Sequence, residues 1–348
     1  MNPRWILLSL AVSFGCVHAQ TTVSDAPDTP FKLATYDAGR GERVGLAIGD
    51  RILDLGEAND HVAREAGLGS MPVPTEMKQL IEEYDRVRSR LYQIANFLDG
   101  KTDGLAFAHD VADVSLKAPI KYPWNLLAAA ANYRSHAAEM NTEANVDPDQ
   151  DFPFLFAKSA RSGIIDPGEP YFIPPGRDKI DWEGELGIVI GNAASRVPLG
   201  EAIDHVFGFT IVYDVSDRGG QHRGNPMFQG PDWFSGKSRD RAAPMGPFIT
   251  PREFLPNHAS LRLVTKVNDR VVQDGNTKDL IYDTEHLVHH ISQVLTLYPG
   301  DVIASGTPDG VGAGRKPPEF LKPGDVVSIE IEGIGTLVTP IQTSQPAS

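Results

Sequence analysis

The sequence predicts an α+β chain, mostly β, with a small N-terminal β/α domain and a larger C-terminal domain. With 348 residues, of which 41% are hydrophobic and 22% charged, the chain is long for one compact unit. Short apolar runs bounded by turn residues outnumber helical patterns. Two polar or proline-containing stretches, Lys101–Asp103 and Lys117–Pro123, favour a boundary between the halves. We therefore place the small domain at 31–115 and the larger one at 120–343.

The small domain is expected to hold a β-hairpin and one helix. Val44, Leu46 and Ile48 alternate along one face of a strand, and Gly49-Asp50 suits a two-residue turn. Further on, apolar residues keep three-to-four spacing until Gly100, which favours an amphipathic helix packed on the hairpin. The predicted elements are strands over 31–36, 44–48 and 51–55 and a helix over 76–98.

Strands dominate the larger domain. Two Pro-Gly-Asp turn signals, at Pro299 and Pro323, each precede a predicted strand. One amphipathic helix interrupts the strands, over 284–297. The predicted strands cover 185–190, 206–215, 261–267, 302–305, 326–331 and 336–341.

The first 19 residues have the pattern of a cleaved signal peptide. Arg4 supplies the basic start, Trp5–Val17 the apolar core, and Val17-His18-Ala19 the cleavage site. We expect export, to the periplasm, or a cytoplasmic location if translation starts further downstream. Cys16, the only cysteine, lies in this segment, so the mature chain needs no disulfide. The net charge of −14 disfavours nucleic acid and membrane surfaces as partners.

Two acidic clusters, Asp181–Glu185 and Asp214–Arg218, lie next to predicted buried strands. Side chains two residues apart on a strand share a face, so Glu183 and Glu185 point the same way. Buried carboxylates that lie close together repel one another unless a cation offsets the charge, and all-oxygen ligation selects hard ions. We hypothesise that Glu183, Glu185 and Asp214 bind one Mg²⁺ or Mn²⁺. A solvated acidic face is the alternative, so the surrounding sequence decides.

Two further groups are suited to chemistry. His136 and Glu139 are three residues apart, which brings them together on one helical turn, and a carboxylate beside imidazole favours proton abstraction from water. Lys237 lies among aromatic and small residues, where it is suited to stabilise an enolate or bind a carboxylate. An exposed ion pair and a solvated lysine are the alternatives. The chain lacks the phosphate-loop, dinucleotide-binding, serine-hydrolase and zinc-protease motifs.

These residues together resemble the fumarylacetoacetate hydrolase superfamily, in particular its acylpyruvase-like and 2-oxo acid hydratase or isomerase-like members. The resemblance runs from about Phe31 to Ile341, and the order and spacing of its motifs are specific. The matching elements are Asn132-Tyr133 with His136 and Glu139; Phe156 with Lys158; Glu183–Gly187; Asp214–Ser216 with Arg218 and Gln221; Lys237; and Gly306–Gly312.

The resemblance implies a mixed β-roll in the C-terminal domain, a homodimer, and Mg²⁺, Mn²⁺ or Ca²⁺ held by two glutamates and an aspartate. It implies that His136 and Glu139 activate water and that Arg218, Gln221, Lys237 and Thr307 contact substrate, with Lys158 adding a charge. Ser216-Asp217-Arg218 departs from the Thr-Ala-Arg-Asp that the family often has there, and the loop over 219–235 is longer than in compact members. Both differences bear on substrate identity.

The leading hypothesis is a divalent-metal-dependent hydrolase that cleaves a C–C bond in acylpyruvate-like β-diketo, 2-oxo acids. The same residues suit a 2-oxo acid hydratase, isomerase, decarboxylase or lyase, because each stabilises an enolate beside a metal. A non-catalytic binding protein for small organic acids is the hypothesis from another class. It predicts that changing His136 alters no measured property.

Overall fold

The computed structural model describes residues 23–140, 145–221, 227 and 230–343. With 31% strand and 27% helix, it confirms the predicted α+β class, in which strand content exceeds helix content. The predicted signal segment and Cys16 lie outside the described residues, so export stays a prediction. No helix within the described ranges is long and apolar enough to cross a bilayer.

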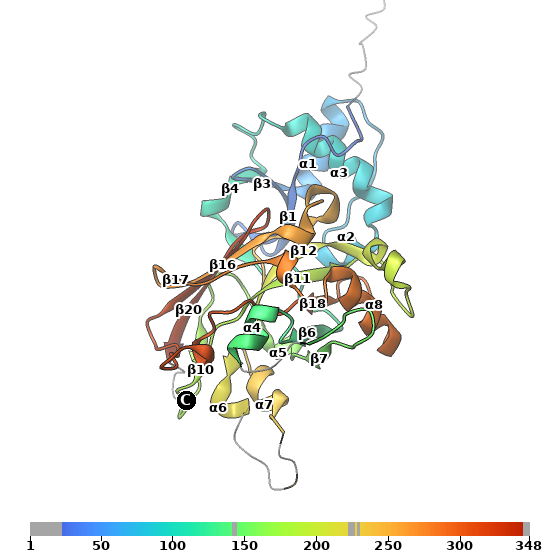
Figure 1. Cartoon of the computed structure of the whole chain (residues 1–348). Helices are drawn as coiled ribbons and strands as arrows, with labels where there is room; N and C mark the ends of the chain where they lie inside the picture. The colour runs from blue at the N-terminus through green and yellow to red at the C-terminus, as the bar shows by residue number, and fades with distance from the viewer. Residues whose placement is uncertain (1–22, 141–144, 222–226, 228–229, 344–348) are drawn as a thin grey trace, which may run out of the picture.

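A five-stranded sheet flanked by helices lies at one end of the molecule, at the top of Figure 1. The strand order is β4-β3-β2-β1-β5. The predicted hairpin is confirmed: Ile48 pairs with Arg51, and Gly49 has φ 58°, as two-residue turns with glycine at the first position require. The strands are β1 (Lys32–Asp37), β2 (Arg43–Ile48), β3 (Arg51–Asp54), β4 (Ala108–Asp110) and β5 (Ser115–Lys117).

The helices of this region differ from the prediction in two respects. The single helix expected over 76–98 is two helices, α2 (Met77–Glu82) and α3 (Tyr84–Leu98), which meet at Glu83. The apolar spacing continues across the break, so the pattern cannot reveal it. A further helix, α1 (Leu55–Glu65), begins where the third strand was expected to end, because the side chain of Asp54 accepts a hydrogen bond from the Glu57 backbone N–H.

Two large mixed sheets form the rest of the chain. The six-stranded sheet has the order β15-β12-β11-β18-β6-β7, and the five-stranded sheet the order β17-β16-β19-β20-β9. β6 runs parallel to β18 and β9 parallel to β20, while the other neighbours are antiparallel.

The first of these sheets consists of β6 (Leu126–Ala130), β7 (Phe154–Ala157), β11 (Gly184–Ile190), β12 (Val206–Tyr213), β15 (Thr250–Pro251) and β18 (Val302–Ala304). The second consists of β9 (Tyr171–Ile173), β16 (Arg262–Val267), β17 (Arg270–Asn276), β19 (Val326–Ile331) and β20 (Gly335–Thr343). Each predicted strand of this region is present within about two residues. Strands β6, β7, β9, β15 and β17 of these two sheets were not predicted.

Shorter elements complete the region. Helix α8 (Thr284–Val294) ends three residues before the predicted end at Leu297. Both Pro-Gly-Asp turns are confirmed, with φ 83° at Gly300 and 96° at Gly324. The remaining elements are α4 (Arg134–Glu139), α5 (Ala160–Gly163), α6 (Arg218–Gln221), α7 (Trp233–Lys237), the pairs β8 (Ile164–Ile165) with β14 (Ala243–Pro244) and β10 (Ile180–Asp181) with β13 (Ser216–Asp217), and six 3₁₀ turns among the described residues.

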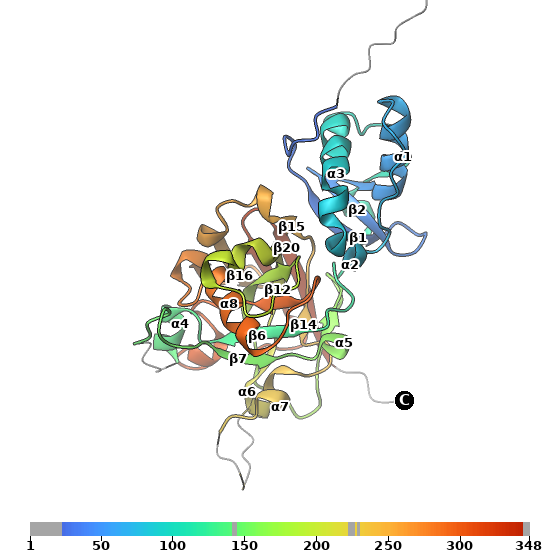
Figure 2. The same cartoon turned by 90° about the vertical axis from the view of Figure 1, so that its right-hand side faces the viewer.

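The six-stranded sheet is buried on both faces. One face shares a core with the five-stranded sheet that contains β16, and one cluster of buried residues includes Leu186, Phe209 and Leu263. The other face shares a core with the N-terminal region, and the same cluster of buried residues includes Val189 and Leu46. Figure 2 shows that region at the upper right, and α6 and α7 at the opposite end of the molecule. A sheet covered on both sides accommodates long apolar strands, and charged residues are confined to the strand ends.

Candidate active site

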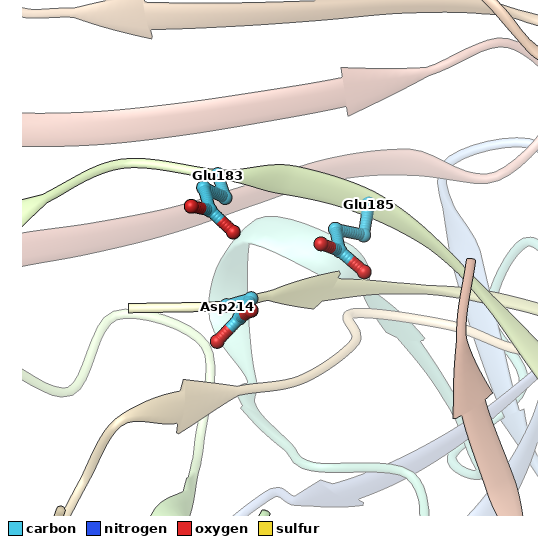
Figure 3. Close-up of side chains that lie close together, drawn as sticks. All are labelled: Glu183, Glu185 and Asp214. Atoms are coloured by element: carbon cyan, nitrogen blue, oxygen red, sulfur yellow. The ribbon is translucent and has the colours of Figure 1, made fainter. Parts of the chain in front are cut away.

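Three acidic residues converge where strand β11 begins and strand β12 ends. Glu183 precedes β11, Glu185 is its second residue, and Asp214 follows β12. The two strands are antiparallel, and the backbone N–H of Asp214 donates to the carbonyl oxygen of Glu183 at 2.9 Å. One carboxylate oxygen from each residue lies within 4.8 Å of the other two, and the side chains point to a common centre (Figure 3). The structure thus brings together all three residues that the sequence predicted as ligands.

Gly184, between the two glutamates, fixes their position in the fold. A Cβ at this residue would lie 2.4 Å from Oγ1 of Thr265 on β16. Only glycine allows β11 to approach the second sheet this closely. Because side chains alternate along a strand, this contact turns Glu183 and Glu185 to the opposite face.

Two buried lysines contact the carboxylates. Nζ of Lys237 lies 2.6 Å from Glu183 Oε2 and 2.6 Å from Asp214 Oδ2, and it donates to Ser216 Oγ at 2.7 Å. Nζ of Lys158 lies 2.5 Å from Asp214 Oδ1. All of these side chains are buried. Lys158 was expected to add a charge near the site, and the structure places it in direct contact with a predicted ligand.

Arg218 joins the cluster from helix α6. Its Nη2 lies 2.5 Å from Glu183 Oε1, and its Nε lies 2.9 Å from Asp181 Oδ2. Asp181 in turn accepts backbone N–H bonds from Gly312 and Ala313. Arg218 therefore links the carboxylate cluster to the loop that follows β18.

The charges act differently on the two glutamates. Burial alone would raise the pKa of Glu183, but the positive charges of Lys237 and Arg218 outweigh burial and lower this pKa. Burial raises the pKa of Glu185 well above its ordinary value, and the carboxylates of Asp214 and Glu183 raise it further. A backbone N–H bond from Gly306, at 2.8 Å, only partly offsets these effects. Glu185 is the carboxylate that lacks a direct cationic partner among the described residues.

These residues fit a divalent cation. The donors are three carboxylates, which hard ions prefer, and three protein ligands leave positions for water or substrate. The cluster, counted with Asp181, has four carboxylates against the cations of Lys158, Arg218 and Lys237. Within the described cluster, Glu185 carries the carboxylate without a cationic partner, so an added cation would be most strongly attracted there.

The predicted proton-transfer pair lies on helix α4. Nδ1 of His136 lies 3.4 Å from Glu139 Oε2, and both side chains are largely buried. Glu139 is held in place by the backbone N–H of Gly310, at 3.0 and 3.2 Å from its two oxygens. Gly314 packs so closely on Glu139 that a Cβ there would lie 2.3 Å from its carboxyl carbon. The loop after β18 thus orients the carboxylate that faces the imidazole.

Two predicted substrate-contacting residues are also buried at this site. The hydroxyl of Thr307 donates to the carbonyl oxygen of Gly184 at 3.0 Å and accepts from Nε2 of Gln273 at 2.7 Å. Gln221 lies at the end of α6, packed against Gly236 of α7. Their contact with substrate stays a prediction.

Sequence reasoning missed three supporting residues. Asp181 was part of the first acidic cluster, yet its bond to Arg218 depends on an antiparallel pairing of β10 with β13 that no local pattern shows. Ser216 was noted only as part of a motif. Gln273, which bonds the backbone N–H of Gly184 and the hydroxyl of Thr307, lies in the unpredicted strand β17 and had no distinguishing signal.

A separate cavity of about 1150 Å³ lies beside Trp182, between the segments 173–178, 267–270 and 318–325. None of the predicted site residues lines it. Trp182 lines this cavity, and its indole N–H donates to the carbonyl oxygen of Gly310 at 3.0 Å. The chemistry is therefore assigned to the carboxylate cluster and not to this cavity.

Comparison with known proteins supports the sequence resemblance. The family model "Fumarylacetoacetate (FAA) hydrolase C-terminal" matches residues 125–342. An uncharacterised protein of Staphylococcus haemolyticus is 38% identical over 320 residues, which cover 89% of this chain and 99% of that protein. An uncharacterised protein of Staphylococcus epidermidis is 41% identical over 232 residues, covering 66% of this chain and 72% of the relative.

Solved structures share the fold over most of the chain. Maleylpyruvate hydrolase from Sphingobium sp. SYK-6 has a TM-score of 0.65 at 29% identity, and fumarylacetoacetate hydrolase from Exiguobacterium antarcticum has 0.68 at 28%. Each match covers 90% of this chain and 100% of the other. Another structure of the Sphingobium enzyme contains manganese(II) and pyruvate. From the family-model match, the relatives and the shared fold, we conclude that this chain belongs to the fumarylacetoacetate hydrolase family.

Proposed function

We propose that the protein is a divalent-metal-dependent hydrolase that cleaves the C–C bond of acylpyruvate-like acids, R–CO–CH₂–CO–COO⁻. The observation that carries the proposal is the convergence of Glu183, Glu185 and Asp214 within 4.8 Å, in a fold that also holds a buried histidine–glutamate pair on α4. Mg²⁺ or Mn²⁺ is the proposed ion. The maleylpyruvate hydrolase structure with manganese(II) and pyruvate supports both the ion and a 2-oxo acid product.

The bound ion would act as a Lewis acid toward the carboxylate and 2-oxo group of the substrate. His136 takes a proton from water, and Glu139 holds the imidazole in the required orientation and stabilises its positive charge. The oxygen of that water forms a bond to the acyl carbon of R–CO. Lys237, whose ammonium lies at the cluster, stabilises the negative charge that develops on the departing fragment.

The products are then R–COOH and pyruvate. The bond between the acyl carbon and the CH₂ group breaks, and its electron pair remains on the CH₂ carbon as an enolate. That carbon takes up the proton held by His136, which restores the neutral imidazole and gives CH₃–CO–COO⁻. One water is consumed, and no oxidant or reductant is needed.

The direct test is cleavage of acetylpyruvate by the purified protein with Mn²⁺, measured as pyruvate formed and as loss of the diketone absorbance. We expect activity with Mn²⁺ and none after EDTA treatment. Glu183→Ala should abolish both the activity and the Mn²⁺-induced rise in melting temperature. Absence of cleavage, despite Mn²⁺ binding, would refute the hydrolase.

His136→Ala separates an enzyme from an organic-acid-binding protein. We expect kcat to fall about 10²- to 10⁴-fold, the usual contribution of a general base, while Mn²⁺ stabilisation is kept. In a protein that only binds organic acids, His136→Ala would change no measured property. Unchanged turnover in His136→Ala would remove the histidine from the proposed chemistry.

Isomerisation is the second candidate activity. A 5-carboxymethyl-2-hydroxymuconate delta-isomerase from Mycobacterium smegmatis has a TM-score of 0.64 at 28% identity, and it covers 90% of this chain. Isomerisation needs the same enolate stabilisation but no attack by water. Assays with a 2-hydroxymuconate-type substrate, alongside acetylpyruvate and oxaloacetate, distinguish isomerase from hydrolase and decarboxylase.

A further inference from the structure

An aromatic row extends from the carboxylate cluster to the protein surface. Phe154 and Phe156 are two residues apart on β7, so they share one face of this edge strand. The ring of Trp233, on α7, lies 5.0 Å from the ring of Phe154 and 5.1 Å from that of Phe156, measured between centroids. Nζ of Lys237 lies 5.4 Å from the centroid of Phe156. Trp233 and Lys237 are four residues apart, hence on one face of α7.

The row has an inner and an outer end. Phe156 is the inner end, because it contacts the ammonium that binds the predicted metal ligands. Phe154 is the outer end, with 55% of its surface exposed. Exposed aromatic surface that continues into a polar site is typical of a ligand contact, since covering it with an apolar group is favourable.

The charges of the site favour a substrate with one carboxylate. Each cation of the described cluster already contacts a protein carboxylate: Lys158 contacts Asp214, Arg218 contacts Glu183, and Lys237 contacts both acids. A second substrate carboxylate laid along the inner part of the aromatic row, beside Phe156, would lose water without gaining a cation from this cluster. Burying an unpaired charge in that way is strongly unfavourable.

We propose that Phe154, Phe156 and Trp233 form the subsite for the group R of the acylpyruvate and select apolar groups, aromatic ones above all. The inference rests on the proposed function, because it assigns the far end of the same substrate. The carboxylate and 2-oxo group lie at the acidic cluster, and R extends along β7 toward Phe154. An aromatic R gains ring–ring contacts worth about 0.5–1.5 kcal/mol each beyond the area it buries.

The test compares kcat/KM with Mn²⁺ for acetylpyruvate, benzoylpyruvate and carboxylate-terminated fumarylpyruvate. We expect the order benzoylpyruvate, acetylpyruvate, fumarylpyruvate. Trp233→Ala and Phe154→Ala should each lower the benzoylpyruvate-to-acetylpyruvate ratio about 10- to 100-fold, the range for losing apolar contacts in a pocket. Because the side chain of Phe154 is already half exposed, Phe154→Ala should not unfold the protein, so it shows whether an effect of Trp233→Ala comes from the subsite and not from misfolding. Trp124→Ala, at a 73% exposed tryptophan before β6, is the matched control and should leave the ratio unchanged.

A binding measurement separates this inference from the hydrolase proposal. Calorimetry of the Mn²⁺-loaded protein should show tighter binding of phenylpyruvate than of pyruvate, and Trp233→Ala should remove most of the difference. Selective binding without cleavage of any diketone supports the subsite and refutes the hydrolase. Cleavage of acetylpyruvate with fumarylpyruvate preferred over benzoylpyruvate, or with an unchanged ratio in both aromatic variants, refutes the subsite and leaves the hydrolase standing.

Discussion

Replacing Glu185 by glutamine should stabilise the metal-free protein while it weakens metal binding. One oxygen of Glu185 lies within 4.8 Å of an oxygen of Glu183 and of Asp214. At that distance and an effective dielectric constant of about 20, each repulsion costs about 3.5 kcal/mol. The attraction of Lys237 offsets part of this cost. The two repulsions sum to about 7 kcal/mol, and an attraction by Lys237 similar in size to one of them leaves a net gain of about 3.5 kcal/mol, or roughly 5 °C for a chain of this size.

The gain should depend on pH in a defined direction. The folded state raises the pKa of Glu185, so it binds this proton more tightly than the unfolded chain does. The associated stability is fully present below the unfolded pKa and is lost as pH rises through the folded pKa. In EDTA, the wild-type protein should thus lose stability as the pH rises from the unfolded pKa to the folded pKa of Glu185, and Glu185→Gln should not. A bound cation replaces the proton and restores the wild-type stability.

Thermal unfolding of both proteins from pH 4 to pH 9, with EDTA or Mn²⁺, measures these effects. Mn²⁺ at about 100 times its Kd should stabilise the wild-type protein by about 2.7 kcal/mol, and Glu185→Gln much less. Glu330→Gln, at an exposed position of β19, is the matched control. A Glu185→Gln protein that melts below wild type in EDTA at pH 8 would show that repulsion does not dominate at this residue.

Two further changes probe the surroundings of the cluster. Lys237→Met removes a buried cationic partner from Glu183 and Asp214, so we expect the free energy of unfolding, measured with urea in EDTA, to fall by about 3–5 kcal/mol. Mn²⁺ should then stabilise this variant more than it stabilises the wild-type protein. Equal stabilisation of the two proteins by Mn²⁺ would contradict this reasoning. Gly306→Ala should lower the melting temperature and weaken Mn²⁺ binding together, because Gly306 has φ 97° and a Cβ there would lie 2.8 Å from Cβ of Asn132. Unchanged Mn²⁺ affinity in this variant would separate the Gly306 turn from the metal site.

The sequence predicted the convergence of Glu183, Glu185 and Asp214 because it follows from local rules, while their role as metal ligands stays a prediction. Alternation along β11 turns Glu183 and Glu185 to one face, and the antiparallel return of β12 brings Asp214 beside them. The hairpin at Gly49 was predicted equally well, since the turn geometry is encoded in two residues. By contrast, the break at Glu83 depends on tertiary packing, and the apolar spacing is the same on both sides of it. Helix α1 had a usable signal, the pair Asp54 and Glu57 at capping-box spacing.

The charge balance of the site is the part that no local pattern could supply. Lys158 and Lys237 come from separate elements 79 residues apart, yet Nζ of Lys158 donates to the backbone carbonyl of Lys237 at 2.5 Å. Both ammonium groups contact Asp214, on opposite carboxylate oxygens. Their positive charge keeps two of the three predicted ligands paired in the metal-free fold, so the unfavourable charge falls on Glu185 alone. A single unpaired carboxylate would favour binding of a cation at a smaller cost in stability than three unpaired buried acids.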